Sequence, residues 1–95
     1  MNSLKEILFE EGYTSEDTLV RDISLLLALS KAEQYRSECE FFKKKYEMSL
    51  DNFEKKLHKQ KGMEVIEKEE DLEDWEFAVN ALRWWEEKVR ELKHV

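Results

Sequence analysis

The chain has 95 residues, of which 41% are hydrophobic and 41% charged, and its formal net charge is −7. This length indicates one domain with a modest core, and the content of large apolar residues argues against disorder. The negative charge disfavours nucleic-acid binding, because that affinity comes mainly from neutralising phosphates. It suits a basic partner instead.

Breakers and cysteines are scarce, with no proline, two glycines and one cysteine. We therefore expect a few long helices and no intramolecular disulfide. Abundant lysine and glutamate with few breakers is typical of heat-adapted proteins. The first residues lack a signal-peptide pattern, and the longest apolar run, ISLLLALS, is shorter than a membrane span. A cytoplasmic protein is expected.

The first predicted helix runs from Leu4 to about Glu11. Ser3 and Glu6 have the spacing of a capping box at its start. Gly12 supplies a residue that readily adopts the left-handed conformation at its end. We expect a short helix followed by a tight turn.

A long second helix is predicted to begin after an N-cap at Thr14 or Ser15. Its residues at steps of three and four form one apolar face. This face consists of Leu25, Ala28, Ala32, Tyr35, Cys39, Phe42 and Tyr46. Leu19, Ile23 and Leu26 fall on the opposite side, so the N-terminal half is apolar nearly all round. We expect that half to lie between two layers.

A third helix is predicted to start at the cap Ser49, with Met48 and Phe53 placed for a hydrophobic staple. Leu50, Phe53 and Leu57 form its narrow apolar stripe, and Gly62 ends the basic stretch that follows. Residues 63–70 fit either a loop or a ragged beginning of the last helix.

The fourth helix is predicted to begin near Asp71, where acidic residues match the helix dipole. At the helical repeat, Trp75 shares a core face with other apolar residues, and Trp85 lies nearer the edge of that face. The other members are Leu72, Ala78, Val79, Leu82, Val89 and Leu92. Phe77 and Trp84 fall almost opposite, and one core face cannot accommodate them.

We interpret Phe77 and Trp84 as anchors for a protein partner, because large aromatics ringed by polar residues resemble binding hot spots. The polar residues beside them are Glu73, Asn80, Glu87 and Glu91. Two alternatives remain open: a homodimer in which two such faces meet, and a monomer in which another helix covers the rings.

Three other features receive simpler interpretations. The acidic run EKEEDLEDWE could hold a metal, but no Glu-x-x-His motif accompanies it, so a solvated helix start is favoured. The seven lysines of residues 43–61 are interrupted by acids, which favours a solvated face over phosphate binding. Cys39 lies in an apolar stripe, as a small core residue does. No catalytic residue, metal ligand or cofactor is predicted.

The segment KKYEMSLDNFEKKL and the later EEDLEDWEFAVNALRWWEEKVREL resemble small acidic helical proteins of archaea and bacteria. The matching residues are Lys45, Tyr46, Met48, Ser49, Phe53, Leu57, Asp74, Trp75, Glu76, Trp84 and Trp85. Some of these proteins are presumed antitoxins encoded beside toxin genes. The chain is also similar to a small all-helical family of hyperthermophilic archaea. The antitoxin-like proteins often have glycine where this chain has Glu47. The resemblance implies a non-catalytic protein that masks a basic, nucleic-acid-cleaving partner.

The sequence thus predicts a single all-α domain of three to four helices in a small bundle, with long second and fourth helices. The expected core includes Leu25, Ala28, Tyr35, Phe42, Trp75, Val79, Leu82 and Val89. The expected function is protein interaction, with a basic partner or with itself, through the Phe77/Trp84 face. The alternative is a metal-dependent nucleotide hydrolase that uses the acids near Glu70 to Glu76.

Overall fold

Four helices follow one another along the chain and confirm the predicted all-α class. The computed structural model describes residues 2–13, 15–60 and 65–94. Helix α1 spans Asn2–Glu10, α2 spans Glu16–Tyr46, α3 spans Leu50–His58 and α4 spans Val65–Lys93. The two long helices are the predicted second and fourth, with 31 and 29 residues. No strand occurs within the described ranges.

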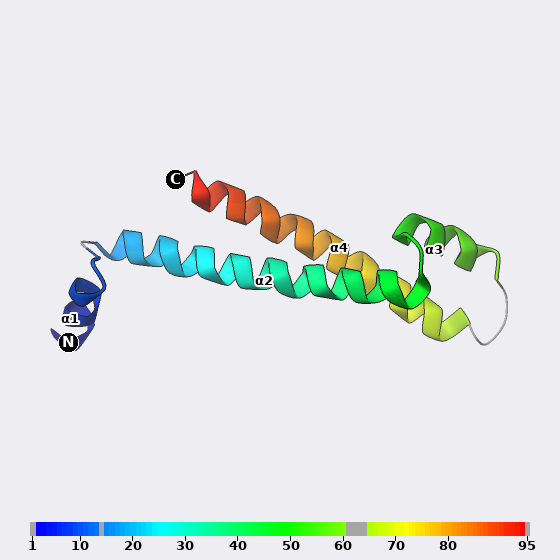
Figure 1. The fold of residues 1–95 in the computed structure, drawn as a ribbon, viewed down its shortest axis with the longest axis horizontal. Helices are drawn as coiled ribbons and strands as arrows, with labels where there is room; N and C mark the ends of the chain where they lie inside the picture. The colour runs from blue at the N-terminus through cyan, green and yellow to red at the C-terminus, as the bar shows by residue number, and fades with distance from the viewer. Residues whose placement is uncertain (1, 14, 61–64, 95) are drawn as a thin grey trace.

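The molecule is long and thin. Helices α2 and α4 run side by side in opposite directions, α3 lies at one end, and α1 stands at the other (Figure 1). The principal extents are 64 × 26 × 17 Å, and the radius of gyration is 19.9 Å. A compact domain of this length has a radius of gyration of about 12 Å. The bundle is therefore three helices thick at one end only.

The helix ends follow local signals in most places. The Ser15 and Ser49 side chains accept hydrogen bonds from the backbone N–H groups of Thr18 and Asn52, each at 3.2 Å. These are the N-caps of α2 and α3. Gly12 adopts the left-handed conformation with φ 85°, as predicted. Gly62 lies outside the described residues.

Two predicted starts are wrong. Helix α1 already begins at Asn2, so Ser3 lies inside the helix instead of capping it. Helix α4 begins at Val65, well before Asp71. The stretch from Val65 to Asp71 holds no proline or glycine, and its acidic side chains are favourable near a helix N-terminus. Residues 63–70 are predicted to be either a loop or the beginning of the last helix. From Val65 onward they are the beginning of the helix.

The turn between α2 and α3 depends on one residue in an unusual conformation. Glu47 is the C-cap of α2 and has φ 52° and ψ 38°. This left-handed region is the one that glycine occupies at helix ends. The chain thus forms a glycine-type turn with a glutamate. A side chain in this conformation costs about 1–2 kcal/mol.

The core is concentrated at the end of the molecule that carries α3, which we call the closed end. Phe42 of α2, Phe53 of α3 and Trp75 of α4 are buried there, with 8%, 3% and 3% of their surfaces exposed. The Phe42 and Trp75 rings stack at 5.8 Å, and Phe53 lies 5.6 Å from Trp75. The surrounding apolar residues are Tyr46, Met48, Leu50, Leu72 and Val79.

Away from this cluster, alanines fill the seam between α2 and α4. Ala28, Ala32 and Ala78 are buried, with 1%, 3% and 0% exposed. Small side chains let the two helix backbones approach closely, but they bury little apolar area. The remaining predicted core residues are only half-buried. These are Leu25, Tyr35, Val79, Leu82 and Val89.

The opposite end, which we call the open end, consists of α1 and the N-terminal part of α2. The N-terminal end of α2 runs past the C-terminal end of α4 (Figure 1). The prediction that this half of α2 lies between two layers is wrong, because α1 turns away from it. Large apolar side chains are exposed here. They are Leu4, Ile7, Phe9, Val20, Ile23, Leu26, Leu27 and Leu29.

No helix within the described residues combines the length and the apolar character that crossing a membrane requires.

Candidate functional site

The two anchor residues that the sequence singles out are both exposed on α4. Phe77 exposes 63% of its surface and Trp84 exposes 52%. They are separated by two helical turns, so their side chains lie on the same side of the helix. The alternative in which another helix of the monomer covers these rings is wrong, because no helix within the described residues covers them.

Each ring has one neighbouring aromatic side chain that limits its motion. The Phe77 ring meets Tyr35 of α2 edge-on, with centroids 5.9 Å apart. The Trp84 ring meets Trp85 edge-on at 4.8 Å. The sequence placed Phe77 almost opposite the core face, whereas the structure places it at the margin of the α2–α4 seam, because the long Tyr35 side chain reaches it. Both rings are held on one side and open on the other.

Lys88 and Glu91 connect the Trp84 ring to the polar rim. The Lys88 ammonium lies 5.0 Å from the centre of the Trp84 ring. The same ammonium forms an ion pair with the Glu91 carboxylate at 3.2 Å. At an exposed site each contact contributes less than about 1 kcal/mol. Their effect is to hold one face of the indole beside a cation.

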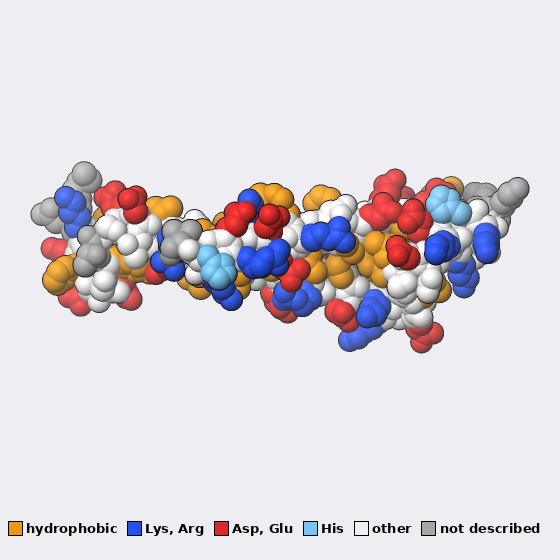
Figure 2. Space-filling model, turned by 90° about the horizontal axis from the view of Figure 1, so that it is seen from above, with side chains coloured by type: hydrophobic (Ala, Val, Ile, Leu, Met, Phe, Trp, Pro, Cys, Tyr) orange, Lys and Arg blue, Asp and Glu red, His pale blue; other side chains and the backbone are white. Residues whose placement is uncertain are grey.

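The rest of the rim is acidic and solvated. Glu73, Asn80, Glu87 and Glu91 are all exposed, as expected for residues on the outer side of α4. In Figure 2, hydrophobic side chains reach the surface among charged ones along the length of the molecule. The surface around Phe77 and Trp84 can therefore present two apolar rings within a mainly negative border.

The other two tryptophans belong to the fold. Trp75 is buried in the closed-end cluster, and Trp85 is half-buried at the edge of the seam. Both placements confirm the helical repeat derived from the sequence. Of the four aromatic rings on α4, Trp75 and Trp85 therefore pack between helices, and Phe77 and Trp84 face outward.

In the acidic run, Asp71 makes hydrogen bonds from α4 to α2. Its Oδ2 accepts hydrogen bonds from Lys45 Nζ at 2.6 Å and from the Tyr46 hydroxyl. Burial by itself raises the pKa of the Asp71 carboxyl, but the bonds from Lys45 and Tyr46 outweigh it and hold the pKa below its ordinary value. The hydrogen bond with Asp71 raises the pKa of Lys45. This cluster stabilises the α2–α4 contact.

The carboxylates that a hydrolase would need are solvated. Glu70, Glu73 and Asp74 are exposed. No group of three or more His, Cys, Asp or Glu side chains is placed to share a metal ion within residues 2–13, 15–60 and 65–94. No specific observation of this structure favours the hydrolase alternative.

The lysine run is distributed over two helices. Lys43, Lys44, Lys55 and Lys56 are exposed, and Lys45 is engaged by Asp71. Lys61 lies outside the described residues. The exposed lysines fit the solvated face expected from the sequence.

Cys39 is half-buried in the seam. Burial raises the pKa of its thiol, and the neighbouring Glu38 and Glu40 raise it further. At neutral pH the side chain is therefore a thiol, which is the weakly reactive form of cysteine.

One apolar surface was missed as a candidate site by sequence reasoning. It is the exposed part of α1 and of α2 at the open end. The signal was present, since α2 is apolar nearly all round in this part, but it was interpreted as burial between layers. Periodicity shows that a side chain is apolar, and only the fold shows whether a neighbour from the same chain covers it.

Comparison with known proteins adds no assignment, because no protein-family model, no curated protein and no solved structure matches the chain.

Proposed function

We propose that the chain is a non-enzymatic interaction module that docks a basic protein through the Phe77/Trp84 face of α4. The observation that carries the proposal is the simultaneous exposure of the two rings, at 63% and 52%. Exposed aromatic groups of this size, bordered by polar residues, mark interaction sites. Each ring is backed by one aromatic neighbour, which lowers the entropy cost of binding.

The charge of the face supports a basic partner. The rim carries Glu73, Glu87 and Glu91, and the whole chain has a net charge of −7. Complementary charge accelerates association and discriminates against wrong partners. The resemblance to presumed antitoxins suggests the class of partner, a basic protein that cleaves nucleic acid and is encoded by an adjacent gene.

The test measures binding to the basic protein encoded beside this chain, by isothermal titration calorimetry. Phe77→Ala and Trp84→Ala should each weaken binding by more than about fivefold, which corresponds to about 1 kcal/mol. Binding should also weaken as salt concentration rises.

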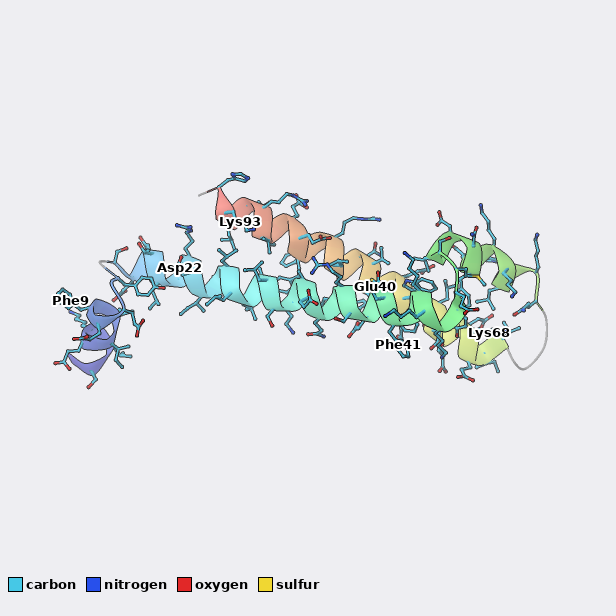
Figure 3. The ribbon with its side chains drawn as sticks, viewed as in Figure 1. Phe9, Asp22, Glu40, Phe41, Lys68 and Lys93 are labelled. Atoms are coloured by element: carbon cyan, nitrogen blue, oxygen red, sulfur yellow. The ribbon has the colours of Figure 1, made fainter. Side chains whose placement is uncertain are left out.

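Phe41→Ala is the matched control. Phe41 is 59% exposed and lies on α2, where its side chain points away from the helix (Figure 3). Its truncation should leave the affinity unchanged. Unchanged binding in both α4 variants would contradict the proposal, as would equal losses in all three. If the α4 variants instead lower the molecular mass of the isolated chain, the face joins two copies rather than a partner.

A further inference from the structure

The whole chain exposes more surface than a compact monomer of its mass usually does. The accessible surface of the chain is 7719 Å² for a mass of 11.6 kDa. A compact monomer of that mass exposes about 5,800 Å². The excess is therefore about 1,900 Å² for one chain. Both the shape of the molecule and its thin core contribute to it.

The exposed residues are concentrated on adjoining elements. On α1, Leu4, Ile7 and Phe9 expose 68%, 60% and 78% of their surfaces. On α2, Ile23 and Leu26 expose 54% and 68%. Figure 3 shows Phe9 on α1, at the end of the molecule away from α3. We define the open-end surface by the apolar residues of both elements. They are Leu4, Ile7, Leu8, Phe9, Leu19, Val20, Ile23, Leu26, Leu27 and Leu29.

The corner between α1 and α2 is defined by specific contacts. Gly12 has φ 85°, and its N–H bonds to the Phe9 carbonyl at 3.0 Å. The Tyr13 hydroxyl donates to the Asp22 carboxylate at 2.9 Å, which links the corner to the second turn of α2. A shallow hollow lies in the corner, between α1 and the start of α2. The described residues of this corner, Gly12 and Tyr13, are thus both hydrogen-bonded.

The absence of charge distinguishes the α2 part of this surface from the rest of the chain. Residues 23–30, ISLLLALS, contain no charged side chain, although 41% of the whole chain is charged. Two copies with a net charge of −7 repel each other at most contacts. Residues 23–30 of one copy can therefore meet the same residues of a second copy without bringing like charges together. A basic partner would find no matching charge along these two turns.

We propose that a second copy of the chain covers the open-end surface, so that α1 and the N-terminal part of α2 from each copy pack together in a symmetric dimer. The second copy supplies the layer that α2 lacks. This surface is separate from the Phe77/Trp84 face, which stays free in the dimer.

Sedimentation equilibrium tests the proposal, over about a hundredfold range of protein concentration. The wild-type chain should have twice the monomer mass of 11.6 kDa. The double variant Ile23→Glu/Leu26→Glu should be a monomer, because a two-fold interface presents each new charge to its own copy. Circular dichroism reports whether the variant keeps its helices.

A milder double variant covers the case in which the charged one unfolds. Ile23→Ala/Leu26→Ala adds no charge and raises helix propensity, so the helix itself is retained. It should raise the dimer dissociation constant by at least about tenfold. An unchanged dissociation constant in this variant would overturn the proposal.

Two controls separate this proposal from the proposed function. Ser37→Glu places a charge on an exposed site of α2 outside the open-end surface and should keep the dimer mass. Phe77→Ala/Trp84→Ala should also keep it. Three results would each overturn the dimer proposed here. The first is loss of the dimer in this second control. The others are a wild-type chain that stays monomeric at all concentrations and one that forms larger assemblies. A wild-type chain that is monomeric or forms larger assemblies leaves the partner titration described above unaffected, whereas loss of the dimer in Phe77→Ala/Trp84→Ala would also show that this face joins two copies.

Discussion

The closed and open ends of the molecule share one helix, α2, but differ in how they use its apolar side chains. At the closed end, Phe42 has 8% of its surface exposed because α3 and α4 both pack around it. At the open end, Leu26 on the same helix has 68% exposed. The apolar side chains are similar in size, and only the number of covering layers differs.

The difference comes from the two short helices. Helix α3 turns back at Glu47 and places Phe53 against Trp75, where the rings lie 5.6 Å apart. Helix α1 has a comparable length, but Gly12 directs it away from α4 (Figure 1). One short helix completes a core and the other extends an uncovered surface. We therefore expect folding stability to reside at the closed end and association at the open end.

Trp75→Ala should produce the largest loss. The ring is 3% exposed and touches aromatic residues from both α2 and α3, so its removal leaves a cavity where three helices meet. The free energy of unfolding should fall by about 3–5 kcal/mol. Urea denaturation followed by circular dichroism measures it. Trp84→Ala is the control and should change stability by less than about 1 kcal/mol. Equal losses would mean that the closed end is not the stabilising region.

Ala78→Leu tests the seam that joins the two ends. Ala78 is completely buried, with 0% exposed, so a larger side chain must push α2 and α4 apart. We expect a loss of about 1–3 kcal/mol in thermal or chemical unfolding. Ala81→Leu, at a half-buried position on the same helix, should cost less. If Ala78→Leu is as stable as the wild type, the helices are not in close contact there.

Asp71→Asn tests the polar part of the closed end. The substitution removes the charge that binds Lys45 and Tyr46 and should cost about 1–2 kcal/mol near pH 7. Because the pKa of Asp71 is lowered in the folded chain, its contribution is complete above the unfolded pKa near 3.9 and is lost as pH falls through the lower folded pKa. Unfolding free energies of wild type and variant should therefore converge only as the pH falls through the lowered folded pKa. A constant difference at all pH values would contradict this assignment.

Glu47→Gly should have the smallest effect, and it should be stabilising. Glycine adopts the φ of 52° found at this position without steric cost, although it loses more backbone entropy on folding. The net gain should be up to about 1 kcal/mol, seen as a higher urea midpoint with an unchanged slope. Glu47→Ala serves as the control and should give no comparable gain, because alanine keeps the Cβ that causes the strain. Destabilisation by glycine would show that the Glu47 side chain itself holds the turn.

Much of the fold could be predicted from particular residues. Ser15 and Ser49 marked helix starts because a side-chain oxygen can satisfy a free backbone N–H. Gly12 marked a left-handed turn for steric reasons. Trp75 was assigned to the core and Phe77 and Trp84 to another side because helix geometry determines which residues share a face. The start of α4 was missed because residues 65–70 are polar and carry no strong signal.

The candidate sites could be predicted only in part. The sequence by itself determined the four helices, their amphipathic faces and the rings that one core face could not hold, because these depend on backbone geometry and local hydrogen bonding. The tertiary structure decided which apolar faces have a neighbour, since coverage depends on contacts between residues far apart in the chain. Helix α3 folds back over Trp75 and α1 turns away from α2, so side chains of equal hydrophobicity are buried at one end of the molecule and exposed at the other.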